Sequence, residues 1–259
     1  MVRLAGRIAP LLLLAFAAAG CVLWPEGSGP GAAVRFDLDH LVLMAHSTGA
    51  WIAPLVLAVE PRFRAAVLSG AGGSWIDNII YKQKPLEPAP LISLFLGIDT
   101  PVASDPSLTL VQWAAEPADP QVYARRILRA PAAGETPRHV LMEQGIVDHY
   151  ILPRIANALS LALGLSLGGP SRDEDVPGQL ELAPLLGHAG AGRVELPVSG
   201  NRGGTTAVVV QHLGDGIEDA HEVLFQTEAP KHEYRCFLES FLRGTPRVLA
   251  GTSADAPCL

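Results

Sequence analysis

The chain has 259 residues, of which 49% are apolar, and it carries a formal net charge of −7. A chain of this length and apolar content can bury a substantial core as one domain of moderate size. The negative balance, with no cluster of Lys and Arg, argues against nucleic-acid binding as its main role. We therefore expect one globular domain and no nucleic-acid partner.

The first twenty residues predict export. Arg3 and Arg7 precede an apolar stretch, residues 8–19, which is too short to span a bilayer and ends in small residues. We interpret residues 1–20 as a signal peptide. The sequence Ala18-Ala19-Gly20-Cys21 also resembles the lipobox of bacterial lipoproteins, although alanine stands at its first position where leucine is usual. The resemblance implies a lipid on Cys21 and a membrane-anchored lipoprotein of a bacterial cell envelope. Simple secretion and an uncleaved anchor are the alternatives.

A linker and then a nucleophile elbow follow. Residues 21–34 are rich in Gly, Pro and Ser, as in a linker that holds a domain off a membrane, and we place the domain at residues 35–259. An apolar run at 41–44 then meets AHSTG, in which Ser47 is flanked by Ala45 and Gly49. Small residues at these two positions are typical of the tight turn that holds a nucleophilic hydroxyl clear of the backbone. The alternative for Ser47 is the N-cap of an ordinary strand-to-helix turn.

The pattern after the elbow predicts a parallel sheet covered by helices on both faces. Further buried strands are expected at residues 64–68, 139–142 and 205–211, and two short ones at 179–182 and 193–197. Residues 75–130 alternate short amphipathic pieces with proline-containing breaks, which is typical of a mobile helical cap. Helices are expected after residue 47, from Pro153, and from near Lys231.

Candidate partners for Ser47 follow the later strands. A serine hydroxyl needs a base to take its proton and an acid to orient that base, and ligands gather beyond the carboxyl ends of parallel strands. Asp148 is the first carboxylate after the third strand, with turn-making or capping as the alternative role. His221 lies in the loop after the fourth strand, with an ordinary surface role as the alternative. The chain order Ser47, Asp148, His221 is the order that α/β-hydrolases use, and it predicts a catalytic triad.

From residue 37 to about 242 the chain resembles the α/β-hydrolases, most closely bacterial extracellular lipases and esterases carried on lipoproteins. The motifs that carry the resemblance are AHSTG, GIVDHYILP and DAHEVLF, with a weaker cap match at residues 106–112 and 117–120. The resemblance implies a serine hydrolase that cleaves a small-molecule or lipid carboxylic ester through an acyl-enzyme intermediate, without a cofactor. The backbone N–H of Thr48 would supply one oxyanion-hole donor.

The remaining cysteines and histidines give weaker expectations. An oxidising compartment favours a disulfide between Cys236 and Cys258, with one buried and one unpaired thiol as the alternative. We expect His46 to be a packing residue near the site and His232 to face solvent. No ligand spacing matches a recognised metal site, including any that would join His149 and His212 to Asp215 and Asp219, so no metal is expected.

The elbow comes unusually early in the chain. An α/β-hydrolase has four strands and two helices before it, so the predicted fold is an α/β-hydrolase-like, mostly parallel sheet with a helical cap and with the N-terminal half of the sheet largely absent. We then expect residues 41–44 to form a sheet edge that is covered by a partner chain, such as a second copy, or by residues 166–204. We also expect an oxyanion hole short of one donor. Two functions compete: an active esterase or lipase, and a truncated or degenerate hydrolase acting as a non-catalytic binding or remnant protein.

Overall fold

The structure, a computed structural model, describes residues 36–174, 176 and 180–258. The predicted signal peptide and the whole predicted linker, which includes Cys21, lie outside the described residues. Among the described residues no helix has both the length and the apolar character needed to cross a membrane.

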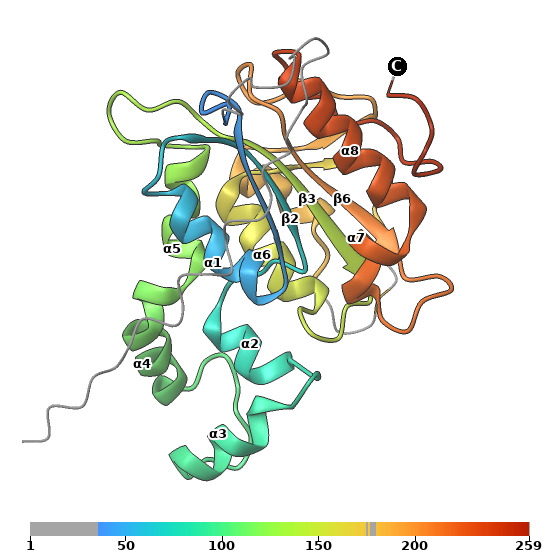
Figure 1. The fold of residues 1–259 in the computed structure, drawn as a ribbon. Helices are drawn as coiled ribbons and strands as arrows, with labels where there is room; N and C mark the ends of the chain where they lie inside the picture. Colours follow the sequence, from blue (N-terminus) through green and yellow to red (C-terminus); the bar gives the residue numbers. More distant parts are fainter. Residues whose placement is uncertain (1–35, 175, 177–179, 259) are drawn as a thin grey trace, which may run out of the picture.

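A parallel sheet forms the centre of the molecule (Figure 1). Its order is β1-β2-β3-β6-β4-β5, and every pair of neighbours is parallel. The strands are β1 Leu41–His46, β2 Phe63–Ser69, β3 His139–Ile146, β4 Ser166–Gly168, β5 Arg193–Val194 and β6 Ala207–Leu213. The predicted fold class, a mostly parallel α/β sheet flanked by helices, is confirmed.

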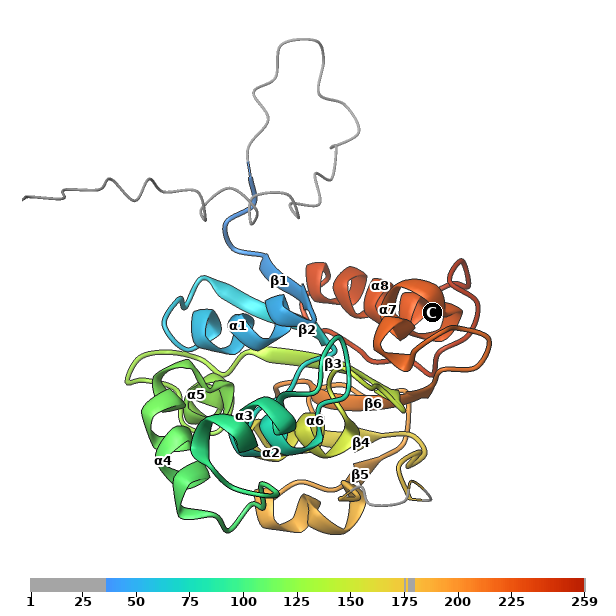
Figure 2. The same cartoon turned by 90° about the horizontal axis from the view of Figure 1, so that it is seen from below.

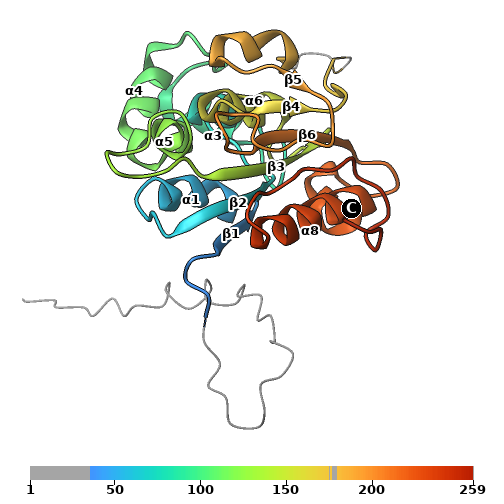
Figure 3. The ribbon, with the colours of Figure 1, turned by 90° about the horizontal axis from the view of Figure 1, so that it is seen from above.

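Helices cover both faces of this sheet. Their bounds are α1 Thr48–Leu57, α2 Trp75–Tyr81, α3 Pro88–Leu96, α4 Pro106–Ala115, α5 Pro120–Ile127, α6 Pro153–Leu163, α7 Val223–Gln226 and α8 Glu228–Leu242, with short 3₁₀ turns η1 Glu116–Ala118, η2 Ala183–Ala189 and η3 Ala220–Glu222. Helices α1, α5 and α6 pack on one face and α7 and α8 on the other (Figure 3).

The two-sided covering explains the sequence of the central strands. In β6, Val208 and Val210 belong to the core beneath α7 and α8, whereas Val209 belongs to the core beneath α1, α5 and α6. A strand buried on both faces needs a continuous apolar run and not an alternating one. This requirement accounts for the β-branched run that predicted β6.

The predicted cap range, residues 75–130, contains two kinds of helix. Helices α2, α3 and α4 lie beyond the carboxyl end of the strands (Figures 1 and 2). Helix α5 instead packs against α1 and α6, and its Ala124 and Ile127 are fully buried in the core. The part of the predicted cap range that lies outside the core, beyond the carboxyl ends of the strands, is therefore α2 to α4.

The sheet beyond β6 differs from the expectation. Residues 180–182 are not a strand, whereas Ser166–Gly168 forms β4 beside β6 and is followed by the 3₁₀ turn η2 and by β5. A strand of three residues, Ser166–Gly168, is too short to show any periodicity. Strand β4 was therefore not visible in the sequence.

The C-terminal tail lies along α8. A disulfide joins Cys236 of this helix to Cys258, and Arg235 donates a hydrogen bond from its Nε to the carbonyl of Ala254 at 3.0 Å. The prediction that His232 faces solvent is wrong, because the tail covers it and its Nε2 lies 3.3 Å from the carbonyl oxygen of Pro257.

Candidate active site

Ser47 occupies a strained turn between β1 and α1. Its backbone has φ 55° and ψ −126°, a region that residues other than glycine rarely adopt. Its N–H donates to the carbonyl of Ser69 at 2.9 Å, which ties the turn to the end of β2. A Cβ at Gly49 would lie 3.9 Å from Cβ of Ala45, an ordinary contact, so alanine in place of the usual first glycine leaves the turn intact.

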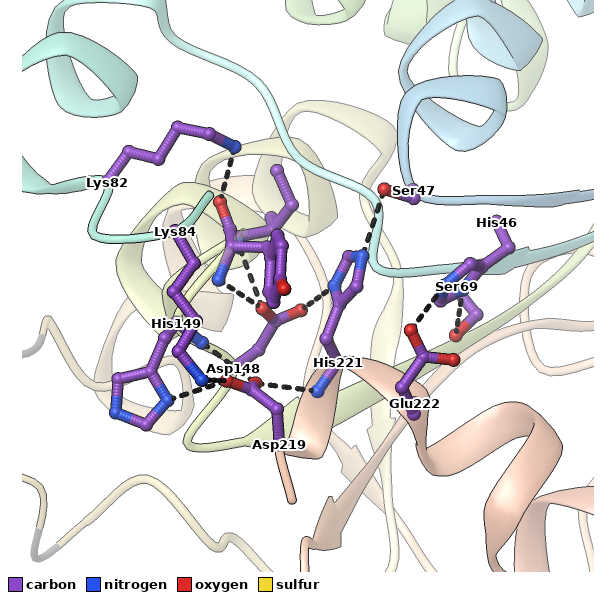
Figure 4. Close-up of polar contacts among 12 residues, drawn as sticks. His46, Ser47, Ser69, Lys82, Lys84, Asp148, His149, Asp219, His221 and Glu222 are labelled. Carbon is purple, nitrogen blue, oxygen red and sulfur yellow. Dashed lines mark hydrogen bonds and ion pairs between the residues drawn. The ribbon is translucent and has the colours of Figure 1, made fainter. Parts of the chain in front are cut away.

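The structure brings Ser47, His221 and Asp148 together (Figure 4). The Oγ of Ser47 lies 2.9 Å from Nε2 of His221, and Nδ1 of the same ring lies 2.7 Å from Oδ2 of Asp148. Each residue follows the end of a different strand: Ser47 follows β1, Asp148 follows β3 and His221 follows β6. In the sheet β3 lies next to β6, and β2 lies between β1 and β3. Ser47 is half-buried, whereas the other two side chains are buried.

Asp148 is held as a hydrogen-bond acceptor. Its Oδ1 accepts from the backbone N–H groups of Tyr150 at 2.7 Å and Ile151 at 2.8 Å, which leaves Oδ2 for the imidazole. Because a carboxylate accepts from Nδ1–H, this arrangement fixes the tautomer in which Nε2 of His221 carries the lone pair. The ring can then accept the proton of the Ser47 hydroxyl.

Two rings flank the imidazole of His221. Tyr150 stacks on it with centroids 4.6 Å apart and an interplanar angle of 21°, and His46 lies on it at 4.6 Å and 47°. His46 is therefore near the site, as expected, and it also contacts Phe225. Burial, and then the nearby His221, lower the pKa of His46, so its ring is predominantly neutral at pH 7.

A second carboxylate, Asp219, links the histidine loop to the cap. It accepts from the N–H of His221 at 3.1 Å, from the N–H of His149 at 3.2 Å, and from Nζ of Lys84 at 2.9 Å. Burial acts to raise the pKa of Asp219, but the hydrogen bonds from Lys84 and the two backbone N–H groups outweigh it and lower the pKa. Asp219 is thus a charged acceptor at neutral pH.

The segment after α2 crosses the turn that carries Asp148. The N–H groups of Gln83 and Lys84 both donate to the carbonyl of His149, at 3.2 and 3.0 Å, and Nζ of Lys82 donates to the carbonyl of Tyr150 at 2.9 Å. We call residues 82–84 the cap strap. It joins the cap to the same turn that orients the imidazole (Figure 4).

Two glycines make room for the histidine loop. A Cβ at Gly70, whose φ is +55°, would lie 2.6 Å from Cε1 of His221. A Cβ at Gly145 would lie 1.8 Å from the carbonyl oxygen of Ala220, so the loop backbone passes directly over β3. At both positions a larger residue would displace the loop that carries the imidazole.

The backbone N–H of Thr48 lies at the start of α1, directly after Ser47. Thr48 is the first residue of α1, so its backbone N–H has no carbonyl one turn earlier within the helix. It is also exposed, next to the half-buried Ser47. The end of a ten-residue helix adds a partial positive charge at the same place.

A separate buried ionic cluster lies under α8. Nε2 of His212 lies 2.7 Å from Oε2 of Glu143 and 3.1 Å from Oε2 of Glu233. Burial raises the pKa of Glu143 to about 8. Burial acts to lower the pKa of His212, but its bonds to the two carboxylates prevail and raise it to about 10.

The structure places His149 and His212, which the sequence analysis considered together as possible metal ligands, in two different clusters. His149 contacts Asp219, whereas His212 joins Glu143 and Glu233 on the other face of β3, so the two histidines do not share a ligand cluster. The contributions of Asp219, Tyr150, Gly70 and Lys84 were missed. All of them depend on loops that meet only in the folded chain, and the sequence carried no local pattern for them.

Several solved structures align with part of this chain at low sequence identity. An acylaminoacyl peptidase from Pyrococcus horikoshii aligns with a TM-score of 0.44 at 13% identity, over 86% of this chain and 26% of that one. A puromycin-hydrolyzing peptidase from Mycobacterium tuberculosis aligns with a TM-score of 0.41 at 16% identity, over 79% and 23%. An acetyl xylan esterase from a Thermoanaerobacterium species aligns with a TM-score of 0.38 at 13% identity, over 75% and 46%. The chain spans about a quarter of the length of the two peptidases and about half that of the esterase.

No family model and no curated protein matches the chain.

Proposed function

We propose that the protein is a serine hydrolase that cleaves carboxylic esters. The observation that supports this most is the hydrogen-bonded chain from the Ser47 hydroxyl through His221 to Asp148, at 2.9 and 2.7 Å. A nucleophile, a base with a fixed tautomer and a buried carboxylate in this order are what acyl transfer by serine requires. The strained backbone at Ser47 adds support, because such strain concentrates at functional sites.

In the first half of the reaction, Nε2 of His221 takes the proton of Ser47 as Oγ attacks the ester carbonyl carbon. The carbonyl oxygen becomes an oxyanion, to which the N–H of Thr48 donates. Asp148 keeps its hydrogen bond from Nδ1–H and stabilises the imidazolium. The imidazolium then gives its proton to the leaving alcohol as the C–O bond breaks, which leaves an acyl group on Ser47.

In the second half, water attacks the acyl group on Ser47 while Nε2 of His221 takes the water proton. Collapse of the tetrahedral intermediate returns that proton to Oγ and releases the carboxylic acid. The cap suggests an aliphatic or lipid-like acyl chain, since Leu110 and Trp113 of α4 are exposed there. We therefore propose small-molecule or lipid esters as the substrate class.

A fluorophosphonate probe and short p-nitrophenyl esters test this proposal. We expect wild-type protein to be labelled on Ser47 and to hydrolyse the esters. Ser47→Ala should lose both properties and lower turnover by several powers of ten. Ser74→Ala is the matched control, because Ser74 also has positive φ (70°) but serves as the N-cap of α2. It should lose about 1 kcal/mol of stability while keeping its activity.

The same experiment separates the enzyme from a non-catalytic binding or remnant protein. Labelling requires an activated hydroxyl, so a folded, monodisperse preparation that resists the probe would favour the second function. Ser47→Ala would then behave like wild type in every assay.

We also propose that the protein is exported and anchored to a membrane through a lipid on Cys21. The Cys236–Cys258 disulfide supports export, because disulfides form and persist in oxidising compartments. Mass spectrometry of the mature protein from a bacterial host would test both points. A diacylglyceryl adduct on an N-terminal Cys21 is expected, and an unmodified N-terminus at Met1 would contradict the proposal.

A further inference from the structure

Three potential metal ligands meet beside the proposed nucleophile. His46, His221 and Glu222 each offer one ligand atom, and these three atoms all lie within 4.8 Å of one another. Two imidazoles and one carboxylate form a donor set that zinc accepts in proteins. This set does not involve the hydrogen bond between Asp148 and His221, which uses Nδ1 of the His221 ring.

The separation of His46 from Glu222 suits a metal ion better than a hydrogen bond. Nε2 of His46 lies 3.8 Å from Oε1 of Glu222, too far for a hydrogen bond. Two ligands about 2.1 Å from a tetrahedral zinc ion lie about 3.4 Å apart. A shift of a few tenths of an ångström would therefore close the pair around zinc, and the Glu222 side chain is 39% exposed and can make it.

The orientation of His46 is fixed from the opposite side. Its Nδ1 lies 3.3 Å from Oγ of Ser69, which leaves Nε2 facing Glu222 (Figure 4). On His221, Nδ1 carries the proton donated to Asp148, so Nε2 is the ring nitrogen whose lone pair can bind a metal. That lone pair is the one that accepts the Ser47 hydroxyl.

We propose that His46, Glu222 and His221 form an inhibitory site for a borderline divalent metal ion such as Zn²⁺. The inhibition rests on the proposed hydrolase function, whereas the binding does not. The metal takes the lone pair of Nε2, and the Ser47 hydroxyl then has no acceptor for its proton. Removal of the ion restores the bond between Ser47 and His221. Hard ions such as Mg²⁺ prefer oxygen ligands and do not compete for this site.

Inhibition of ester hydrolysis tests the site in tag-free protein. We expect micromolar Zn²⁺ to abolish p-nitrophenyl ester hydrolysis, EDTA to restore it, and the same concentration of Mg²⁺ to leave it unchanged. His46→Gln and Glu222→Gln, each scaled to its own metal-free rate, should raise the half-inhibitory Zn²⁺ concentration at least about tenfold, since even residues that only support ligands cost 10–100-fold in affinity. His188→Gln and Glu218→Gln are the matched controls, because both residues are exposed and lie outside the cluster.

Calorimetry with Zn²⁺ keeps binding separate from turnover. Ser47→Ala should still bind Zn²⁺, whereas His46→Gln should lose this binding event. Ester hydrolysis that is absent even without metal, together with intact Zn²⁺ binding, would overturn the hydrolase proposal and leave the metal site standing. Equal inhibition of wild type and both ligand variants, or Zn²⁺ binding that His46→Gln does not change, would overturn the metal site.

Discussion

At the scale of single residues, Gly70 decides where the imidazole of His221 can lie. A Cβ at this position would come within 2.6 Å of the ring, and the backbone φ of +55° adds strain for any residue with a side chain. We expect Gly70→Ala to displace the imidazole and to lower kcat by on the order of 10²-fold, since a misplacement near 1 Å costs that much. Ester kinetics on the purified variant would measure the loss.

Gly97 provides the control for Gly70. Its φ is +68°, and a Cβ there would meet nothing within 4 Å, so Gly97→Ala brings the same kind of backbone strain without the contact. Both variants should lose some stability, and only Gly70→Ala should lose turnover. An equal loss of kcat in the two variants would assign the effect to strain and not to the imidazole.

The buried cluster of Glu143, His212 and Glu233 predicts how stability depends on pH. Folding raises the pKa of Glu143 from 4.5 to about 8 and that of His212 from 6.5 to about 10. The folded chain therefore binds these protons more tightly than the unfolded chain does. Each such proton makes stability fall with rising pH by about 1.4 kcal/mol per pH unit, between the unfolded and the folded pKa.

We expect the Tm of wild type to fall as pH rises from 6 to 9. The Tm of Glu143→Gln should fall less steeply over the same range. Glutamine removes the proton that Glu143 binds on folding and replaces the carboxyl group that contacts Nε2 of His212. Differential scanning fluorimetry across the pH series would measure both slopes. Glu239→Gln is the control, because Glu239 lies on α8 outside the cluster and should keep the wild-type slope. Parallel curves for Glu143→Gln and wild type would contradict this account.

At the scale of elements, the cap strap, the turn that carries Asp148 and the loop that carries His221 meet at Asp219. Asp219→Ala removes the acceptor for the N–H groups of His221 and His149 and the partner of Lys84. We expect kcat to fall at least about tenfold with a smaller change in KM, because a buried donor left unpaired costs about 1–3 kcal/mol and the loop relaxes. Steady-state kinetics on p-nitrophenyl esters would show this split.

Lys84→Met tests the strap side of the same contact. The Lys84 side chain is 39% exposed, and a partly exposed ion pair contributes at most about 1 kcal/mol. A loss of a few-fold is therefore expected, smaller than that of Asp219→Ala. Glu218→Ala, at an exposed neighbouring position, should leave kcat unchanged. A larger effect from Lys84→Met than from Asp219→Ala would mean that the cap, and not the loop, depends on this contact.

Elements with strong local patterns were predictable from the sequence, and elements set by long-range contacts were not. The apolar runs of β1, β2, β3 and β6 were visible because β2, β3 and β6 are mostly buried, β1 is mostly half-buried, and each run is followed by small or polar residues. The order of Ser47, Asp148 and His221 was visible for the same reason, since each follows a strand. Strand β4 was too short, and the burial of His232 depended on a tail joined to α8 by the disulfide.

At the scale of the whole molecule, two surfaces compete as a site of self-association. Strand β1 pairs only with β2 among the described residues, which makes it the sheet edge that the sequence predicted. Helix α3, at the far end of the cap, has no buried residue, and its Leu94 and Phe95 are 81% and 83% exposed. The side chains of β1 are already mostly half-buried, and its free backbone groups can bond to water, so α3 has more apolar surface to bury.

The exposed apolar surface therefore predicts that self-association uses α3 in place of the β1 edge. Light scattering after size exclusion should show wild type shifting toward a dimer as concentration rises. The double variant Leu94→Glu/Phe95→Glu should stay monomeric, because charged side chains on both copies repel and no longer gain from burial. Leu242→Glu, a single change at a residue 37% exposed at the end of α8, is the control and should dimerise like wild type. A double variant that still dimerises would exclude α3 and leave the edge of β1 as the interface, since its unpaired backbone groups are unaffected by substitutions in the cap.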